Sequence, residues 1–227
     1  LLRDIRRSPE PAVNTGNAFA AISKSGNLAY ISDPGDSLIN MSVDLAGRAT
    51  PLPEIRSGIA GVSPDGSQMV GIHDGGWWVY SLTGRAAPTP ITSAQAAYAN
   101  PLWTSDGTRI IFRSRRASRP AIVSRRADGT GSEELLLPRD GCPVGWSRDG
   151  QTLFYLFEKQ LWSWRRGGES RSLASIDAPY ASLSPDRQWV AFHTFERGRS
   201  VVYIQSLSSG ARFRVAEADG HAPLWAP

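Results

Sequence analysis

The sequence contains little of what several classes of protein require. It has one cysteine, Cys142, so it can form no internal disulfide and offers no cysteine cluster for a metal. No run approaches the roughly 18 apolar residues of a membrane span, and the opening residues Leu1-Leu2-Arg3 do not begin a secretory signal. No long segment has the 3.6-residue periodicity of an amphipathic helix, which argues against helical repeats.

Lysine is also scarce, because Lys24 and Lys159 are the only lysines among 25 basic residues and the rest are arginines. The net charge is a modest +4, and a nucleic-acid surface would need the arginines clustered on one face. Arginine pairs at 125–126 and 165–166 occupy equivalent turns and could form an anion-binding rim. We interpret them as a solvated rim and predict no nucleic-acid partner.

A short turn motif recurs at nearly even intervals of about 40 residues. In each clear copy the first residue is Ser or Thr and the second is Pro, Ser or Arg. The third residue is Asp, and the fourth is Gly or, in one copy, Arg. Asp caps the backbone of such a turn, and Gly takes the position with positive φ. The clear copies are Ser63-Pro64-Asp65-Gly66, Thr104-Ser105-Asp106-Gly107, Ser147-Arg148-Asp149-Gly150 and Ser184-Pro185-Asp186-Arg187, with a weaker copy at 23–26.

Alternating apolar runs follow each turn and predict strands, with second and third runs further on. Four strands in about 40 residues, repeated, are typical of a β-propeller blade. We therefore predict an all-β propeller of four-stranded blades, with five nearly complete blades of a six-bladed ring. Residues 1–16 would end a preceding blade and connect it to the repeats. The propeller would span 17–227, with blades at about 17–55, 56–93, 97–139, 142–176 and 179–217 and the start of a sixth from 221.

The tryptophans follow the repeat. Trp103, Trp146 and Trp225 share one position, before the turn, where we expect them to pack between blades. Trp77 and Trp164 are candidates for exposed contact residues. The chain also starts without Met and stops early in a repeat, so we expect it to be cut from a longer protein.

The turn Ser-Pro-Asp-Gly before an apolar strand, followed by Trp78-Val79-Tyr80-Ser81-Leu82 and a Gly turn, resembles the TolB-like, WD-repeat-like propellers of bacteria. The order of motifs from Phe19 onward looks most similar to propeller regions attached to bacterial serine/threonine kinases or to transcription-factor-type domains. The resemblance implies a periplasmic or extracellular location and a protein partner, since TolB binds a peptidoglycan-associated lipoprotein through its propeller. The chain shows no counterpart of the separate N-terminal domain of TolB.

The residues give less support to an enzymatic function than to a non-catalytic one. The Gly-x-Ser sequences lack the final Gly of a hydrolase nucleophile elbow. The turn aspartates could suggest a glycoside hydrolase, but their identical place in each turn gives every one a structural reason. The three histidines, His73, His193 and His221, show no metal-ligand spacing. We predict no catalytic residue, no metal and no cofactor.

The function predicted is therefore a non-catalytic module for protein interaction or ligand sensing, within a larger bacterial protein. The partner would be a protein or peptide, and a small-molecule ligand stays possible. The alternative is an accessory sensor or gate of an enzyme, either a kinase or a prolyl-oligopeptidase-type peptidase, whose catalytic domain lies outside this chain. A carbohydrate-active propeller is a third interpretation.

We expect the working surface at the mouth of the central channel, on the face that carries the loops between second and third strands and between successive blades. The candidate binding residues on this face are Tyr98, Asn100, Arg115, Arg116, Asp177, Tyr180, Asp219 and His221.

Overall fold

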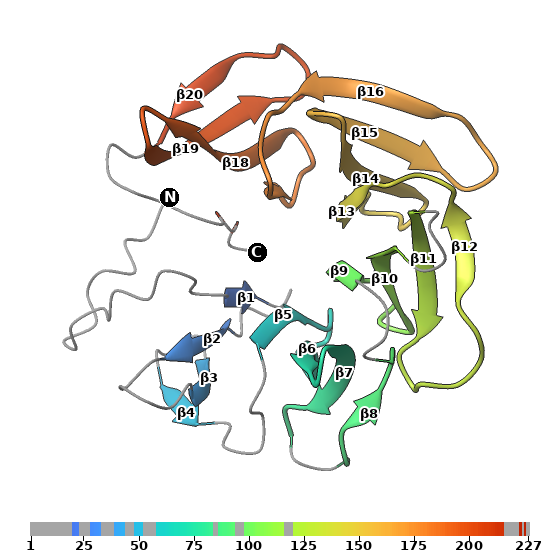
Figure 1. The fold of residues 1–227 in the computed structure, drawn as a ribbon. Helices are drawn as coiled ribbons and strands as arrows, with labels where there is room; N and C mark the ends of the chain where they lie inside the picture. The colour runs from blue at the N-terminus through green and yellow to red at the C-terminus, as the bar shows by residue number, and fades with distance from the viewer. Residues whose placement is uncertain are drawn as a thin grey trace.

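Five four-stranded antiparallel sheets follow one another along the chain and stand around a central opening (Figure 1). This computed structural model describes residues 20–22, 28–32, 39–43, 48–51, 58–83, 86–93, 98–115, 120–215, 223 and 225. In every sheet the strands lie side by side in chain order. The first strands of successive sheets also contact one another, which places them innermost. The fold is the predicted all-β propeller of four-stranded blades.

The blades are numbered 1 to 5 in chain order. Blade 1 comprises β1 (Ala20–Ile22), β2 (Leu28–Ser32), β3 (Ile39–Val43) and β4 (Ala49–Pro51), and blade 2 comprises β5 (Gly58–Val62), β6 (Gln68–His73), β7 (Gly76–Ser81) and β8 (Thr89–Pro90). Blade 3 comprises β9 (Tyr98–Trp103), β10 (Arg109–Ser114), β11 (Ala121–Arg126) and β12 (Glu134–Leu137). Blade 4 comprises β13 (Cys142–Trp146), β14 (Thr152–Phe157), β15 (Gln160–Arg165) and β16 (Ser170–Ser175), and blade 5 comprises β17 (Ala181–Leu183), β18 (Trp189–Glu196), β19 (Arg199–Ser206) and β20 (Arg212–Arg214).

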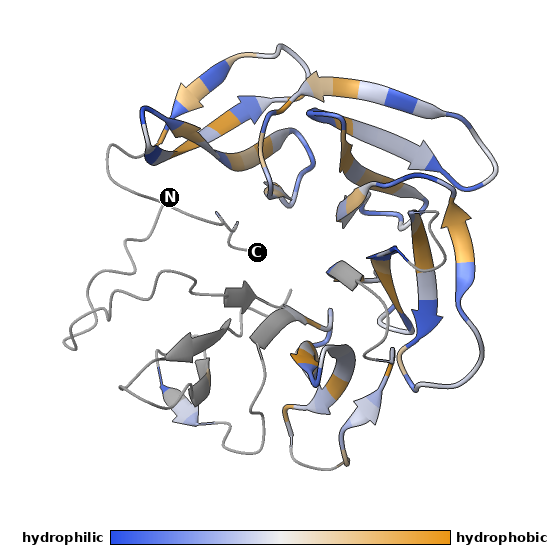
Figure 2. Cartoon of the chain, viewed as in Figure 1, coloured by the Kyte–Doolittle hydropathy of each residue, from blue (hydrophilic) through white to orange (hydrophobic). Residues whose placement is uncertain are grey.

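The hydrophobic core lies between the blades, because the sheets of blades 2 to 5 bury side chains on both of their faces. Successive residues of a strand point to opposite faces, so Phe112 packs toward blade 2 while Ile111 packs toward blade 4. Phe192 of blade 5 packs in the same way against Leu156 and Leu161 of blade 4. The hydropathy colouring follows this pattern, with apolar positions scattered along the strands of every coloured blade (Figure 2).

Two tryptophans show where the sequence reasoning went wrong. Trp77 and Trp164, proposed as exposed contact residues, are only 5% and 7% exposed. Trp77 packs between blades 2 and 3, and Trp164 packs between blades 3 and 4. When a strand is buried on both faces, side chains that point to either face can lie in the core. The alternation of side chains along such a strand therefore does not show which tryptophan is exposed.

The tryptophan that precedes the turn makes a repeated contact between blades, as predicted. Trp103 is 5% exposed, and its indole Nε1 donates to the carbonyl of Gly61 in the preceding blade at 3.3 Å. Trp225 donates in the same way to the carbonyl of Ser182, at 2.8 Å. Gly61 and Ser182 occupy the same position of their strands, two residues before the turn Ser. Trp225 therefore takes the place beside blade 5 that Trp103 takes beside blade 2.

The turn motif closes the hairpin between the first and second strands of its blade. In blade 2, Asp65 accepts hydrogen bonds from the Ser63 hydroxyl at 2.6 Å and from the Ser67 amide at 3.1 Å, and the Ser63 hydroxyl oxygen accepts from the Gln68 amide. The same bonds recur in blades 3, 4 and 5. The fourth position has positive φ in all four turns, including Arg187 at 61°. The turn is therefore a structural device of the repeat.

Candidate binding surface at the mouth of the propeller

The two faces of the ring differ in what they carry. One face carries the turns between first and second strands and the hairpins between third and fourth strands, and we call it the turn face. The other carries the hairpins between second and third strands and the connections between blades, and we call it the mouth face. All the predicted binding residues that the structure describes belong to strand ends or connections of the mouth face. Arg116, Asp219 and His221 lie outside the described residues.

Asn100 lies on the innermost strand β9, half-buried and with φ of 55°. A β-bulge places Asn100 and Pro101 opposite one residue of β10, since Ala99 pairs with Arg113 and Leu102 pairs with Ile111. Asn tolerates positive φ better than most residues, and a residue before proline avoids the right-handed helical region. Bulges also interrupt the innermost strands β5 and β13. Each bulge changes the direction of an inner strand near the mouth of the channel.

Arg115 belongs to a charged cluster between blades 3 and 4 that the sequence reasoning found only in part. Asp140 bridges two guanidinium groups, with Arg113 Nε at 2.6 Å from Oδ1 and Arg115 Nη2 at 3.4 Å from Oδ2. Arg113 Nη1 also donates to the sulfur of Cys142 at 3.3 Å. The Arg113 side chain is 17% exposed and that of Arg115 is 51% exposed. The inner arginine therefore joins the blades, while the outer one presents a positive charge to solvent.

Asp177 forms a surface ion pair with Lys159, with 2.9 Å between the ammonium nitrogen and Oδ2. The pair links the β14–β15 hairpin to the connection that leaves blade 4. Both side chains are more than two-thirds exposed, so solvent screens the attraction. Such pairs contribute about 0–1 kcal/mol to stability. Both groups remain accessible to a binding partner.

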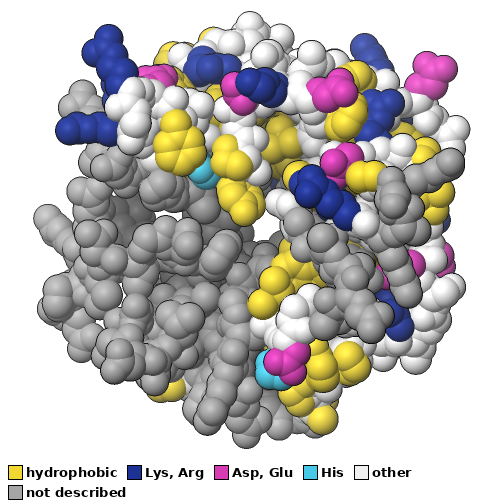
Figure 3. Space-filling model, viewed as in Figure 1, with side chains coloured by type: hydrophobic (Ala, Val, Ile, Leu, Met, Phe, Trp, Pro, Cys, Tyr) yellow, Lys and Arg dark blue, Asp and Glu magenta, His cyan; other side chains and the backbone are white. Residues whose placement is uncertain are grey.

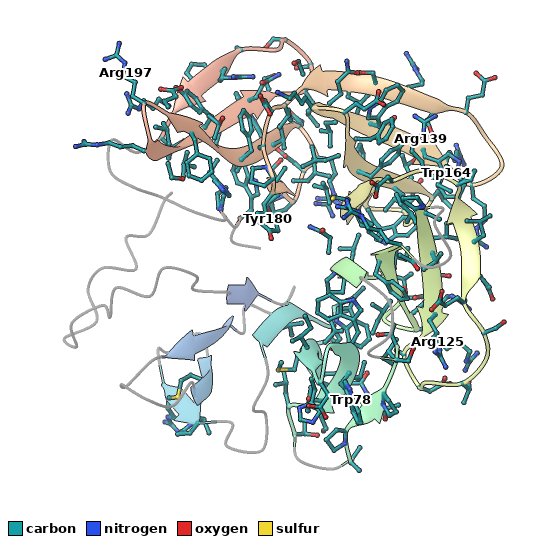
Figure 4. All side chains as sticks on the ribbon, viewed as in Figure 1. Trp78, Arg125, Arg139, Trp164, Tyr180 and Arg197 are labelled. Atoms are coloured by element: carbon teal, nitrogen blue, oxygen red, sulfur yellow. The ribbon has the colours of Figure 1, made fainter. Side chains whose placement is uncertain are left out.

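Tyr180 begins a row of aromatic rings along blade 5. Its ring stacks on His193, with 6.1 Å between centroids, and Phe195 meets the other side of His193 edge-on at 5.9 Å. His193 is only 4% exposed, whereas Tyr180 is 47% and Phe195 62% exposed. Figure 3 shows this row of hydrophobic side chains beside a histidine, running outward from the central opening, and in Figure 4 Tyr180 points toward the centre of the ring. The mouth face thus exposes an apolar surface on a fixed support.

The sequence reasoning selected Tyr180 on this face but did not select Phe195. Tyr98 lies at the start of β9, and its strand position is all that the structure describes. The described candidates are spread over blades 3, 4 and 5. Only Arg115 and Tyr180 are centres of clusters in which several side chains meet.

The turn face offers less for binding, because its polar groups are occupied by the turns themselves. Hydrogen bonds from the Ser or Thr hydroxyl of each turn, followed by hydrogen bonds from other groups of the turn, lower the pKa of all four turn aspartates, Asp65, Asp106, Asp149 and Asp186. A depression of about 320 Å³ lies between the turns of blades 2 and 3, and Asp65 and Asp106 line it. These carboxylates therefore stabilise the repeat.

The arginine pairs lie on the turn face, in the hairpins between third and fourth strands. Arg126 Nη2 lies 2.6 Å from Oδ2 of Asp128, and Arg125 donates to the carbonyl of Gly129. A hydrogen bond from Arg126 is the main reason that the pKa of Asp128 lies well below its usual value. In blade 3, therefore, both arginines of the pair are engaged by their own hairpin. This agrees with the interpretation as a solvated rim.

Within the described part of the chain, no group of three or more His, Cys, Asp or Glu side chains is placed to hold a metal ion. His73 lies beside Asp74, with 3.5 Å between Nε2 and Oδ2, and its ring meets Trp78 edge-on. His193 lies in the aromatic row of blade 5. Over the same described residues, no helix has the length and apolar character needed to cross a membrane.

Comparison with known proteins identifies the fold. No protein-family model matches the chain, and no curated protein sequence matches it. Among solved structures, TolB from Acinetobacter baumannii is 23% identical with a TM-score of 0.73, over 92% of this chain and 56% of that one. A TolB from Agrobacterium tumefaciens is 19% identical with a TM-score of 0.60, over 75% of this chain and 65% of that one.

Propellers of enzymes are similar as well. The acylaminoacyl peptidase of Pyrococcus horikoshii is 15% identical with a TM-score of 0.58, and the match covers 91% of this chain and 40% of the peptidase. This chain spans less than two-thirds of the length of each of these three structures. At such identities the likeness concerns the fold. The chain is a β-propeller whose fold is similar to that of the TolB structures.

Proposed function

We propose that this propeller is a non-catalytic protein-interaction module that binds its partner through the mouth face. The observation that carries the proposal is the aromatic row of blade 5, where Tyr180 and Phe195 stay about half exposed while His193 beneath them is buried. Large aromatic side chains held on a rigid support are typical anchors of protein interfaces, because little side-chain entropy is lost when they bind. Arg115, held by Asp140, adds a positive charge to the same face.

The likeness to two TolB structures supports an interaction role, because the resemblance to TolB implies a protein partner. It also supports a periplasmic or extracellular location within a larger bacterial protein. The turn aspartates support a non-catalytic role, since all four are committed to hydrogen bonds within their turns. A ligand-sensing role would use the same mouth face.

The second candidate is an accessory sensor or gate of an enzyme. The likeness to the acylaminoacyl peptidase favours it, because the match covers only 40% of that longer chain. In this case the propeller would still bind through the mouth face, but its contact would be the catalytic domain of its own protein. The same accessory role would apply if the catalytic domain of the protein were a kinase.

Variants on the two faces test the proposal. Tagged wild-type protein, Tyr180→Ala and Arg115→Glu would be used to capture proteins from the native host, with quantitative mass spectrometry as the readout. Leu135→Ala and Arg166→Glu are matched controls, because Leu135 is an exposed apolar residue of an outer strand and Arg166 is exposed on the turn face. We expect at least one captured protein to be depleted by the two mouth-face variants and kept by the controls. Depletion by the controls alone would contradict the proposal.

A further inference from the structure

The hairpin of blade 5 has longer strands than the equivalent hairpins of blades 2 and 4. β18 and β19 have eight residues each, whereas β6, β7, β14 and β15 have six each. The second strand begins at the same point of the repeat in blades 4 and 5, where the amides of Thr152 and Trp189 bond to the turn Ser hydroxyls. The additional length therefore lies at the mouth-face end, where Phe195 pairs with Ser200 and Glu196 pairs with Arg199. Two residue pairs add about 6–7 Å to a strand.

We call residues 195–200 the blade-5 spur. Its shape is fixed at both ends. The Phe195 ring meets the buried His193 ring edge-on, with an interplanar angle of 83°. At the tip, Arg197 and Gly198 have φ of 49° and 79°, values that close a tight two-residue hairpin. A partner would therefore meet a preformed surface, and little ordering would oppose its binding.

The spur carries one acidic side chain, Glu196, and two basic ones, Arg197 and Arg199. Glu196 accepts a hydrogen bond from the Tyr203 hydroxyl at 2.5 Å, which occupies its carboxylate. Arg197 and Arg199 are exposed, and neither forms an ion pair with a described residue. In Figure 4 Arg197 extends away from the ring, at the far end of blade 5 from Tyr180. Arg199 pairs with Glu196 across the hairpin, so both lie on the face opposite to Phe195, whereas Arg197 lies at the tip. The spur thus places an exposed aromatic ring two residues from the exposed guanidinium of Arg197.

We propose that the blade-5 spur, together with Tyr180, binds a segment of a partner protein in which an acidic side chain lies next to an aromatic or aliphatic one. The apolar side chain would cover Phe195 and Tyr180, and the carboxylate would pair with Arg197, whose planar guanidinium can bind it through two hydrogen bonds. This inference rests on the proposed function and adds the chemistry of the partner. An anionic membrane is less well matched, because lipid-binding surfaces collect about 4–8 basic residues.

Selection from a displayed library of random dodecapeptides tests the inference. The library would be selected in parallel on the wild-type protein and on Phe195→Ala. We expect peptides enriched on the wild type alone to carry Asp or Glu close to Phe, Trp, Leu or Ile. Binding of a synthesised, enriched peptide should weaken about tenfold or more in Phe195→Ala and in Arg197→Glu, corresponding to about 1.4 kcal/mol. The controls Leu135→Ala and Arg166→Glu should bind it as the wild type does.

Four outcomes would overturn the inference. Equal enrichment on wild type and Phe195→Ala would show that the spur is not used, and enriched peptides without acidic residues would show that the charge is not read. Peptides that are lost in Arg115→Glu but kept in Phe195→Ala would place binding elsewhere on the mouth face, so the proposed function would survive while this inference fails. Sedimentation with vesicles of phosphatidylserine and phosphatidylcholine, if abolished by Arg197→Glu/Arg199→Glu, would assign the spur to a membrane surface instead.

Discussion

Gly141 is the position at which one added methyl group should most clearly destabilise the propeller. It is buried between blades 3 and 4, and a Cβ there would lie 2.6 Å from Cδ2 of Tyr155 and 3.0 Å from Cδ1 of Ile122. Both neighbours are fully buried, so neither side chain can move into solvent. Gly141 does not have positive φ, so Gly141→Ala should destabilise through these steric contacts and not through backbone strain. Overpacking of this kind costs about 1–3 kcal/mol.

Gly61→Ala is the matched control. Gly61 also lies on an inner strand beside another blade, but a Cβ there would have its nearest neighbours at 3.6 Å, an ordinary contact distance. Replacing Gly by Ala at such a site stabilises by about 0.4–1 kcal/mol through the unfolded chain. In a chain of this size, 1 kcal/mol shifts Tm by about 2–4 °C. Calorimetry should therefore find Gly141→Ala about 2–12 °C below the wild type and Gly61→Ala at or above it. Equal Tm values for the two variants would refute the packing between blades 3 and 4.

Three further predictions concern stability. Thr92→Val should cost about 1–3 kcal/mol in denaturant unfolding, because it leaves the buried Trp77 amide, now bonded to the Thr92 hydroxyl at 2.7 Å, without an acceptor. Replacing Glu158-Lys159 by Asn-Gly should raise Tm, since both residues have positive φ in a two-residue hairpin; an unchanged or lower Tm would contradict this. The turn aspartates have lowered pKa values in the folded state, so their contribution to stability is complete above about pH 5 and is lost as the pH falls below about 4. A free energy of unfolding that stays constant down to pH 3 would contradict this account.

The turns and the blade order could be predicted from the sequence because they depend on local chemistry. The turn needs a hydroxyl, a carboxylate and a residue with positive φ within four positions, and the chain repeats this set at each blade. Even Arg187, which replaces the expected Gly, adopts φ of 61°. The closing bonds of the turn are local as well, since Asp65 bonds to Ser63 and Ser67. A short pattern was therefore sufficient to predict the fold class.

Contacts between blades could not be predicted in the same way, because they join residues far apart in the chain. Nothing near Arg113 in the sequence indicates that its guanidinium reaches Asp140 and Cys142 of the next connection. The same limit explains why Trp77 and Trp164 were wrongly proposed as exposed. The bulge at Asn100 depends on the register with β10, which a single strand does not reveal.

The candidate site was predicted only in outline. Propeller geometry placed Arg115 and Tyr180 on the mouth face, but it would select similar positions in any propeller. Phe195 had a signal in the sequence that was not used. The apolar alternation of β18 continues through His193 to Phe195 and ends at Arg197-Gly198, two residue pairs later than in blade 4. The length of this hairpin relative to that of blade 4 therefore predicts its extension on the mouth face.

Photo-crosslinking from the mouth face tests the central claim most directly. A photoreactive amino acid would replace Tyr180 in one variant and Arg166 of the turn face in another, and both would be irradiated in the native host. The account predicts a discrete crosslinked protein from position 180 and none from position 166. A product from position 166 alone, or the same product from both positions, would contradict the claim that the mouth face is the binding surface.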